Sequence, residues 1–541
     1  MSSGRTQRFW TGMGAAAGVM MLLAGCAEDP SGPDEAGCAS LVDRTWGDAT
    51  IESATALEAE DELEVTGSEV KISDLPELCR VQGVATPTAE SRIAFEVWLP
   101  SDWDGRIHMV GNGGYSSAMN FGLMADLVRG GSAAVATDTG HEGDDLSFGA
   151  ENIEARNDWG HRAVHESIVA AKHIVEEHYA RSAEYSYFSG CSTGGHQGLM
   201  EAQRYPDDFD GVIAGAPGNN RTNLNLGFLW QYLSNHERDG GDETILDSSD
   251  LEKINQAVVA RYDDRDGVED GVISDPSDLR FDPDLLEEEG VSLSDRQISA
   301  LESMYQGPKH QRTGDVIYPG WPVGSEWLET EAGSAGWDGY WADPALPSQP
   351  SRVDFFRSWV FDDPEWDWWE FDWSADVDEV HTVMGPVVDA TDPDLSAFQS
   401  SGGKLLMFTG WQDPVVSATD VLGYYDEVVG ASGSLESAQD FARLFMVPGM
   451  GHCGGGPGAT LFSSSTQGAE GIQDDADHNL IRALEAWVED GTVPESLVAT
   501  RPGPDSDSFT RTLCPHPQTA KYIPGGDQAR AESFECVDEQ G

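Results

Sequence analysis

Positive charge is scarce in this chain of 541 residues. It has 31 lysine and arginine residues against 96 aspartate and glutamate residues, a formal net charge of -65 at pH 7, and only six lysines. The acidic residues are scattered along the chain, so they must coat much of the surface. A field of this sign repels nucleic acid and anionic membranes, which excludes nucleic-acid binding. Because concentrated salt screens such a surface, we predict a salt-adapted protein. The alternative is an acidic extracellular protein without a salt requirement.

Long apolar runs are also missing, apart from one short run near the N-terminus. Residues 13–23 are small and apolar, follow two arginines, and are too few to span a bilayer. The run leads into Leu-Ala-Gly-Cys, which resembles a bacterial lipoprotein processing site. We predict a lipoprotein signal peptide over residues 1–25, lipidation of Cys26 and a flexible tether over 26–37. An ordinary secretory signal with a chance cysteine is the alternative.

This N-terminus predicts an exported protein, anchored by lipid to the cell envelope on the periplasmic or outer side, or released from it. Contact with a membrane is expected only through that anchor. The sequence leaves open which membrane carries the anchor, and it leaves the oligomeric state open as well.

Cysteine is rare too, with seven residues in the chain. If Cys26 carries lipid, six remain, and an even number in an exported chain is typical of disulfides. Six cysteines can pair in fifteen ways, so counting alone leaves the pairing open. The six are Cys38, Cys79, Cys191, Cys453, Cys514 and Cys536.

Apolar residues make up 39% of the chain and are spread along it, enough for a large core. Between residues 107 and 217, short apolar runs alternate with stretches of helical spacing. The order strand, helix, strand, helix, strand is typical of a parallel sheet. Buried-strand runs return at 404–409 and 442–447, after a long stretch rich in tryptophan and in Asp/Gly/Pro turns.

The segment GCSTG at 190–194 fits the motif G-x-S-x-G, in which the serine sits on a sharp turn between a strand and a helix. Strand-like YSYFS precedes it and a helical pattern follows. Asp413 and His452 each come just after a buried-strand run, where open α/β sheets build active sites. We predict Ser192 as nucleophile, His452 as general base and Asp413 as the residue that orients the imidazole. Taken singly, Asp413 could be a turn residue and His452 a loop histidine.

A tetrahedral intermediate needs N–H donors for its oxyanion. We predict the amide of Thr193 as one donor. The second is expected from Gly113 or Gly114, in the Gly-rich turn after an earlier strand. A plain tight connection is the alternative for that turn.

These positions predict an α/β class, specifically an α/β-hydrolase fold with a large lid inserted between the nucleophile and the acid. The catalytic domain is expected to comprise residues 38–219 and 400–541, with the lid domain at 220–399.

The chain resembles the tannase / feruloyl esterase family, which includes the hydrolase of mono(hydroxyethyl) terephthalate. The similar stretches are YSYFSGCSTGGHQGLMEAQRYPDDFDGVIAGAPGNN, DWGHRAVHES before it, and GWQDP and GMGHCGGGPG after it. The likeness runs from about Cys38 to near the C-terminus. It implies three disulfides, Cys191–Cys453, Cys38–Cys79 and Cys514–Cys536, the first joining the serine loop to the histidine loop.

The resemblance also implies a structural Ca²⁺ in the lid and no organic cofactor. The ligands would be the carboxylates of Asp263, Asp266 and Asp270 and the carbonyls of Val268 and Val272. Dense hard oxygen ligands suit Ca²⁺. An acidic turn in a very acidic protein is the alternative. One departure is that a tyrosine precedes the first ligand, where family members often have a disulfide-bonded cysteine.

We therefore expect a serine carboxylesterase, similar to feruloyl esterases and tannases, that acts on small esters of aromatic (phenolic) acids. The alternatives are a general aryl or alkyl esterase and a non-catalytic surface lipoprotein that binds aromatic or polysaccharide ligands. Lid aromatics could stack on a phenolic acyl group or simply form the lid's own core.

Overall fold

The computed structural model of the protein describes residues 35–59, 62–64, 71–330, 333–334, 336–463, 467, 471–503 and 508–538. The predicted signal peptide, Cys26 and the tether up to residue 34 lie outside the described residues. Residues 35–37, the end of the predicted tether, begin helix α1 (Glu35–Ala39). In the described part of the chain, no helix combines the length and the apolar character needed to cross a bilayer.

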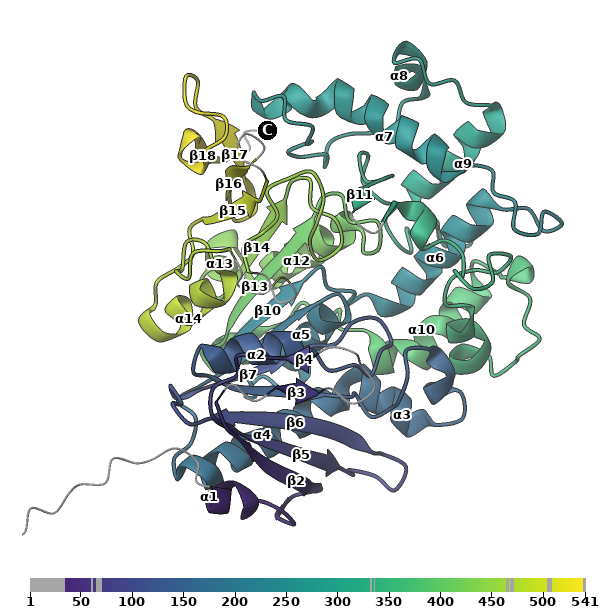
Figure 1. The fold of residues 1–541 in the computed structure, drawn as a ribbon. Coiled ribbons are helices and arrows are strands. Elements are labelled where there is room, and N and C mark those ends of the chain that lie inside the picture. The colour runs from purple at the N-terminus through teal and green to yellow at the C-terminus, as the bar shows by residue number, and fades with distance from the viewer. Residues whose placement is uncertain are drawn as a thin grey trace, which may run out of the picture.

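A mixed sheet of ten strands forms the centre of the molecule (Figure 1). The strands β1, β2, β5 and β6 run antiparallel to their neighbours. The other strands of this sheet, β8, β7, β9, β10, β13 and β14, are parallel to one another. In spatial order the strands are β1 (Thr45–Trp46), β2 (Ala49–Leu57), β5 (Leu78–Ala85), β6 (Ile93–Pro100), β8 (Ala133–Thr137), β7 (Arg106–Val110), β9 (Tyr185–Cys191), β10 (Gly211–Gly215), β13 (Lys404–Gly410) and β14 (Ala442–Val447).

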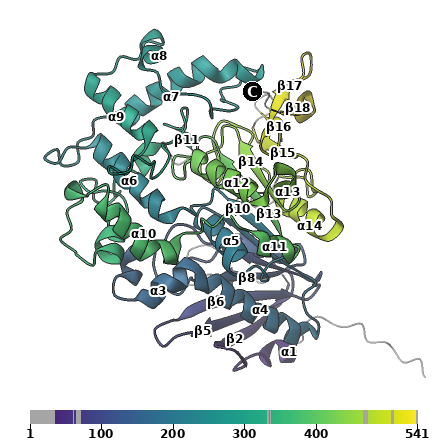
Figure 2. The same cartoon turned by 180° about the vertical axis from the view of Figure 1, so that it is seen from behind.

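Helices cover both faces of this sheet, because side chains alternate along each strand between two apolar cores. In β13, Leu405 and Met407 join the core beneath α4, α5 and α12, whereas Leu406 and Phe408 join the core beneath α2 and α14. Figure 1 shows the face carrying α2 and α14, and Figure 2 the face carrying α4, α5 and α12. These helices are α2 (Phe121–Arg129), α4 (Ala163–Tyr179), α5 (Thr193–Arg204), α12 (Ala418–Ser432) and α14 (Leu480–Asp490).

The remaining elements of the sheet-bearing part are short. They are β3 (Leu63–Glu64), β4 (Lys71–Ile72), η1 (Leu146–Gly149), α3 (Ile153–Asn157), η2 (Asp158–Arg162), α13 (Leu435–Gln439), β15 (Leu497–Arg501), β16 (Phe509–Leu513), β17 (Gln518–Tyr522), η7 (Ala531–Ser533) and β18 (Phe534–Asp538).

A long insertion separates two strands that are neighbours in the sheet. β10 pairs with β13 in parallel, with Gly211 opposite Lys404, so the chain between residues 215 and 404 leaves the sheet and returns to it. It carries α6 (Arg221–Asn235), α7 (Ser248–Tyr262), η3 (Asp263–Asp266), α8 (Pro283–Glu288), α9 (Asp295–Gln306), β11 (Glu329–Thr330), β12 (Gly333–Ser334), η4 (Trp337–Gly339), η5 (Phe355–Val360), η6 (Trp368–Glu370), α10 (Ala375–Val388) and α11 (Ser396–Ser400).

Aromatic side chains attach this insertion to the sheet-bearing part. Phe355, Phe356 and Trp359 of η5 are buried in one cluster with Tyr115, from the loop after β7, and Trp159 of η2. The Trp359 ring meets both of those rings edge to face. These lid aromatics therefore form packed core.

Candidate active site

Ser192 occupies a strained turn between β9 and α5. Its backbone has φ 63° and ψ -117°, a conformation that residues with a Cβ rarely adopt. Its N–H donates to the carbonyl of Gly215 at 2.9 Å, and its carbonyl accepts from the N–H of Gly218 at 3.2 Å. The strand-to-helix turn predicted from G-x-S-x-G is thus present, and backbone bonds hold it in place.

Gly190 of the motif and Gly195, directly after the motif, are needed because backbone segments approach them closely. A Cβ atom on Gly190 would lie 2.4 Å from the carbonyl carbon of Gly194, and one on Gly195 would lie 2.3 Å from the carbonyl oxygen of Gly215. Both distances are shorter than any side chain tolerates. The turn therefore admits only glycine at these two positions.

Asp413 and His452 are hydrogen bonded to each other. Asp413 follows β13 and is fully buried, and its Oδ2 lies 2.8 Å from Nδ1 of His452, which follows β14. Its Oδ1 accepts the N–H groups of Val415 at 2.8 Å and Val416 at 3.0 Å. With Nδ1 donating to the carboxylate, Nε2 of His452 keeps the lone pair that a general base requires.

The serine and histidine loops are covalently joined. Cys191 and Cys453 form a disulfide, with Cα atoms 5.9 Å apart. Since consecutive Cα atoms are about 3.8 Å apart, the Cα atoms of Ser192 and His452 can be no more than about 14 Å apart. Within the described residues the Ser192 hydroxyl makes no hydrogen bond. Such contacts often tighten only when substrate is bound.

The predicted oxyanion residues lie together at the start of α5. Thr193 is fully buried, and its hydroxyl donates to the carbonyl of Gly114 at 2.8 Å. Its amide is among the first of the helix, which have no acceptor inside the helix. Gly114 has φ 56°, and Gly113 precedes it in the same turn. The structure thus brings the Gly-rich turn beside the residue that follows the nucleophile.

Two arginines beside this turn are not indicated by any motif in the sequence. Nη2 of Arg221 donates to Thr193 Oγ1 at 2.9 Å, and burial lowers the pKa of Arg221 to about 10. The guanidinium carbon of Arg352 lies 5.6 Å from the ring centroid of Tyr115 and 4.7 Å from that of Phe228. Nη1 of Arg352 is buried without a hydrogen-bond partner. Only the folded lid brings these cations to the site.

The other two pairings implied by the resemblance are also present. Cys38 pairs with Cys79, and Cys514 pairs with Cys536. All six cysteines of the described chain are therefore in disulfides.

The acidic loop after α7 has a tight, hydrogen-bonded form. Oδ1 of Asp263 accepts the N–H groups of Asp270, Gly271 and Val272 at 2.9–3.2 Å. Oδ1 of Asp266 accepts the N–H of Val268 at 3.0 Å. The loop thus gathers all five predicted ligand residues.

Two features of this loop fit a cation. Oδ1 of Asp270 is buried without a hydrogen-bond partner, while its Oδ2 pairs with Arg511. Burial, together with the charges of Asp270 and Asp263, raises the pKa of Asp266 to about 6. The carboxylate oxygens of Asp263, Asp266 and Asp270 do not all lie within 4.8 Å of one another. They would have to draw closer around an ion.

Comparison with known proteins gives consistent matches over most of the chain. A family described as "Tannase and feruloyl esterase" matches residues 79–537. An uncharacterized esterase of Xanthomonas campestris pv. campestris is 34% identical over 541 aligned residues, covering 93% of this chain and 91% of that protein. Feruloyl esterase B of Aspergillus niger is 31% identical, covering 85% and 87%.

Solved structures agree with these sequence matches. The crystal structure of feruloyl esterase B from Aspergillus oryzae superposes with a TM-score of 0.82 at 26% identity, covering 93% of this chain and 100% of that one. The tannin acyl hydrolase of Aspergillus niger superposes with a TM-score of 0.72 at 20% identity, a similarity of fold.

Proposed function

Because the chain belongs to the tannase and feruloyl esterase family, we propose that it is a serine carboxylesterase that hydrolyses small esters of phenolic acids. The observation that carries this proposal is the hydrogen bond between His452 Nδ1 and buried Asp413 Oδ2, at 2.8 Å, beside the strained Ser192 turn. A protein that only binds ligands has no need of this arrangement.

The reaction follows from the roles of these groups. Nε2 of His452 takes the proton of the Ser192 hydroxyl as its oxygen attacks the ester carbonyl carbon. The imidazolium then gives the proton to the alcohol oxygen as the C–O bond breaks, which leaves an acyl-serine. Water, deprotonated by His452, attacks the acyl carbon and releases the acid and free Ser192. Asp413 stabilises the charged imidazole in both halves.

The oxyanion of each tetrahedral intermediate needs preorganised donors. Thr193 and the turn of Gly113 and Gly114 are the candidates. The bonds from Arg221 to Thr193 and from Thr193 to Gly114 hold both parts in a fixed relation. Arg221 is thus a positioning residue in this scheme.

The preference for an aromatic acyl group rests on the relatives and on the lid. The Aspergillus niger protein that covers most of this chain is a feruloyl esterase. Tyr115 and Phe228 lie under Arg352, whose Nη1 has no partner. Both rings are themselves buried, so the free Nη1 of Arg352 is the group that suits an oxygen of a phenolic acid.

A panel of esters tests the proposal. Methyl ferulate, a gallate ester, mono(hydroxyethyl) terephthalate and nitrophenyl acetate would be assayed in low and high salt. Turnover of the first three well above nitrophenyl acetate supports a phenolic esterase, and the reverse order indicates a general esterase. No turnover of any ester would leave only the binding protein.

The Ser192→Ala variant tests the mechanism. It should lose turnover while circular dichroism and the melting temperature stay near wild type. Ser189→Ala is a matched control, because Ser189 is a buried serine on β9 whose hydroxyl has no partner. Activity that survives the first change would refute the nucleophile.

We also propose export with a lipid anchor at Cys26 and a structural Ca²⁺ in the lid at residues 220–399. Three disulfides support an oxidising compartment. Cys26→Ser expressed with the native leader should release the protein from the membrane fraction. An unchanged distribution would argue against the anchor.

A further inference from the structure

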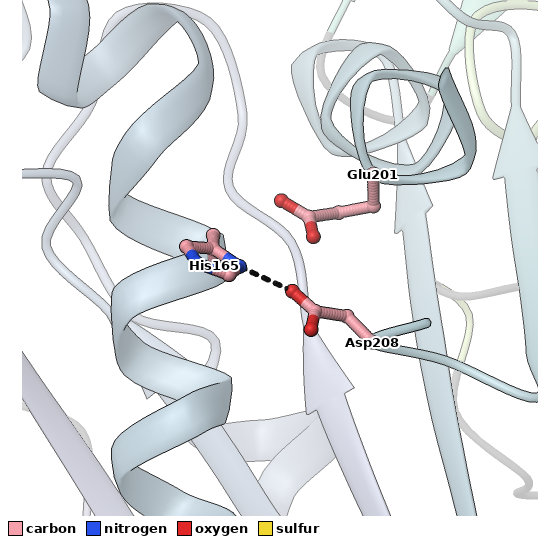
Figure 3. A group of neighbouring side chains, drawn as sticks. All are labelled: His165, Glu201 and Asp208. Carbon is pink, nitrogen blue, oxygen red and sulfur yellow. Dashed lines mark hydrogen bonds and ion pairs between the residues drawn. The ribbon is translucent and has the colours of Figure 1, made fainter. Parts of the chain in front are cut away.

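We propose that His165, Glu201 and Asp208 form a second metal site, one that binds a divalent transition ion, Zn²⁺ in the first place. One potential ligand atom from each residue lies within 4.8 Å of the other two. Figure 3 shows the three side chains converging from separate elements. His165 comes from α4, Glu201 from α5, and Asp208 from the connection between α5 and β10.

This cluster is separate from the proposed esterase site. Glu201 is eight residues along α5 from Thr193, and at about 1.5 Å per residue this is about 12 Å from the nucleophile end. The predicted calcium loop lies in the lid insertion. The cluster is therefore a feature of the sheet-bearing part.

The burial of Glu201 is the observation that points to a bound cation. The residue is 1% exposed, and its Oε2 is buried without a hydrogen-bond partner. A buried carboxylate without a cation is costly. Burial and the neighbouring Asp208 carboxylate raise the pKa of Glu201 well above its ordinary value. Asp208 is paired with His165 and Lys172 lies nearby, but Oε2 of Glu201 has no cation bonded to it, and a dication would supply one.

The neighbouring groups leave the ligand atoms available. The ammonium of Lys172 donates to the backbone carbonyl of Asp208, not to its carboxylate. The Asp210 carboxylate accepts the amide and hydroxyl of Ser186. His165 Nδ1 lies 2.6 Å from Asp208 Oδ2. A metal would replace this hydrogen bond with one coordinate bond to Nδ1 of the neutral imidazole and one to Asp208 Oδ2, and the shared proton would pass to water.

The ligand chemistry selects the ion. An imidazole nitrogen with two carboxylates suits Zn²⁺ and its neighbours in the transition series, whereas Ca²⁺ and Mg²⁺ prefer all-oxygen sets. The His165 side chain is 30% exposed, which leaves a path for the ion and room for a water ligand. The ring also stacks on Tyr205, with centroids 4.0 Å apart, which fixes its plane.

Such an ion would tie the nucleophile helix to α4 and to the strand that follows. The rival is a proton shared between Glu201 and Asp208, which would satisfy the same oxygens without a metal. The experiment must separate the two.

The test uses the full chain, stripped of metal and kept in saturating Ca²⁺ so that the lid loop is occupied. Co²⁺ and Zn²⁺ are titrated by calorimetry, and bound metal is counted by mass spectrometry. We expect one equivalent per chain, visible d–d absorption of the Co²⁺ form and an upward shift of the melting temperature by several degrees.

Two variants and one control locate the binding. Glu201→Gln keeps the shape of the side chain, and His165→Gln changes a half-exposed position, so each can be tested if the other fails to fold. Both variants should lose the one equivalent of bound Co²⁺ or Zn²⁺. His478→Gln is the control, because His478 and Asp475 form an exposed pair of similar geometry at 2.7 Å, and it should retain binding.

Absence of binding to the wild type, or binding that survives Glu201→Gln and His165→Gln, would overturn the proposal. A Glu201→Gln variant that is more stable than metal-free wild type at pH 8, with no metal effect on either, would assign the cluster to the shared proton. Neither result depends on esterase activity.

Discussion

Cys191 and Cys453 are 262 residues apart in sequence and bonded in the fold. They stand directly beside Ser192 and His452, so the covalent bond joins the two loops whose side chains must exchange a proton. The chain between them includes the whole lid. Movement of the lid is thus kept from separating the nucleophile from its base.

Removing this disulfide by Cys191→Ser with Cys453→Ser should lower both stability and kcat. The chain-entropy model gives about 5 kcal/mol for so long a loop, and small displacements of the base slow proton transfer. Thermal unfolding and steady-state kinetics measure the two effects. The control is the double serine variant at Cys514 and Cys536, whose disulfide closes a loop of only 22 residues. This variant should affect stability alone. An unchanged kcat in the first variant would limit the bond to a structural role.

Asp413→Asn should lower kcat by about 10⁴-fold with little change in melting temperature. The amide oxygen can still accept the N–H groups of Val415 and Val416, but the amide nitrogen would then face Nδ1 of His452. Nδ1 would have to become the acceptor, so Nε2 would carry the proton and could not act as a base. Kinetics on a nitrophenyl ester measure the loss. A fall below tenfold would show that Asp413 is not the orienting acid.

The local pattern was sufficient to predict the strand ends that carry the triad. The run 442–447 coincides with β14, and 404–409 with all but the last residue of β13. Buried parallel strands are short apolar runs, so the polar residues that follow them stand out. The G-x-S-x-G motif adds backbone constraints that are visible in its glycines.

Other elements could not be predicted from the local sequence pattern. The sequence pattern does not predict β2 and β5, which pair with each other. β2 is rich in alanine, serine and threonine and only partly buried, so it has no apolar run. Helix α5 begins at Thr193, and glycines obscure its first turn in the sequence. Arg221 and Arg352 reach the site only through the fold of the lid.

Asp138→Asn should raise stability at pH 8 and have little effect at pH 4. Burial raises the pKa of Asp138 to about 7, although the amides of Gly140 and Ala94 oppose this shift. The native state therefore holds a proton that the unfolded state has lost between about pH 4 and 7, and stability falls as pH rises through this window. Asparagine can keep both amide bonds, since Oδ1 accepts them. Melting curves of both proteins from pH 4 to 8 measure the difference, and parallel curves would contradict it.

Removal of Ca²⁺ should lower the melting temperature by several degrees and reduce kcat much less. The unpartnered Oδ1 of Asp270 and the raised pKa of Asp266 both indicate a charge that the ion would balance. Melting with a Ca²⁺-selective chelator, and again after Ca²⁺ is restored, measures the effect. Asp270→Asn should abolish the response, and Asp363→Asn, at an acidic lid position outside the loop, should keep it. Equal responses in the two variants would place the ion elsewhere.

Salt should stabilise the protein steeply up to about 1 M, because the charge of -65 is spread over the surface. The Debye length falls from about 10 Å at 0.1 M to about 3 Å at 1 M, so repulsion between neighbouring carboxylates fades over this range. Melting temperatures measured in KCl from about 0.05 to about 3 M should rise by many degrees and then level off. Sucrose at matched osmolality is the control, since it is excluded from protein surfaces without screening charge. If sucrose gives the same rise, or KCl gives none, the acidic surface is not an adaptation to salt.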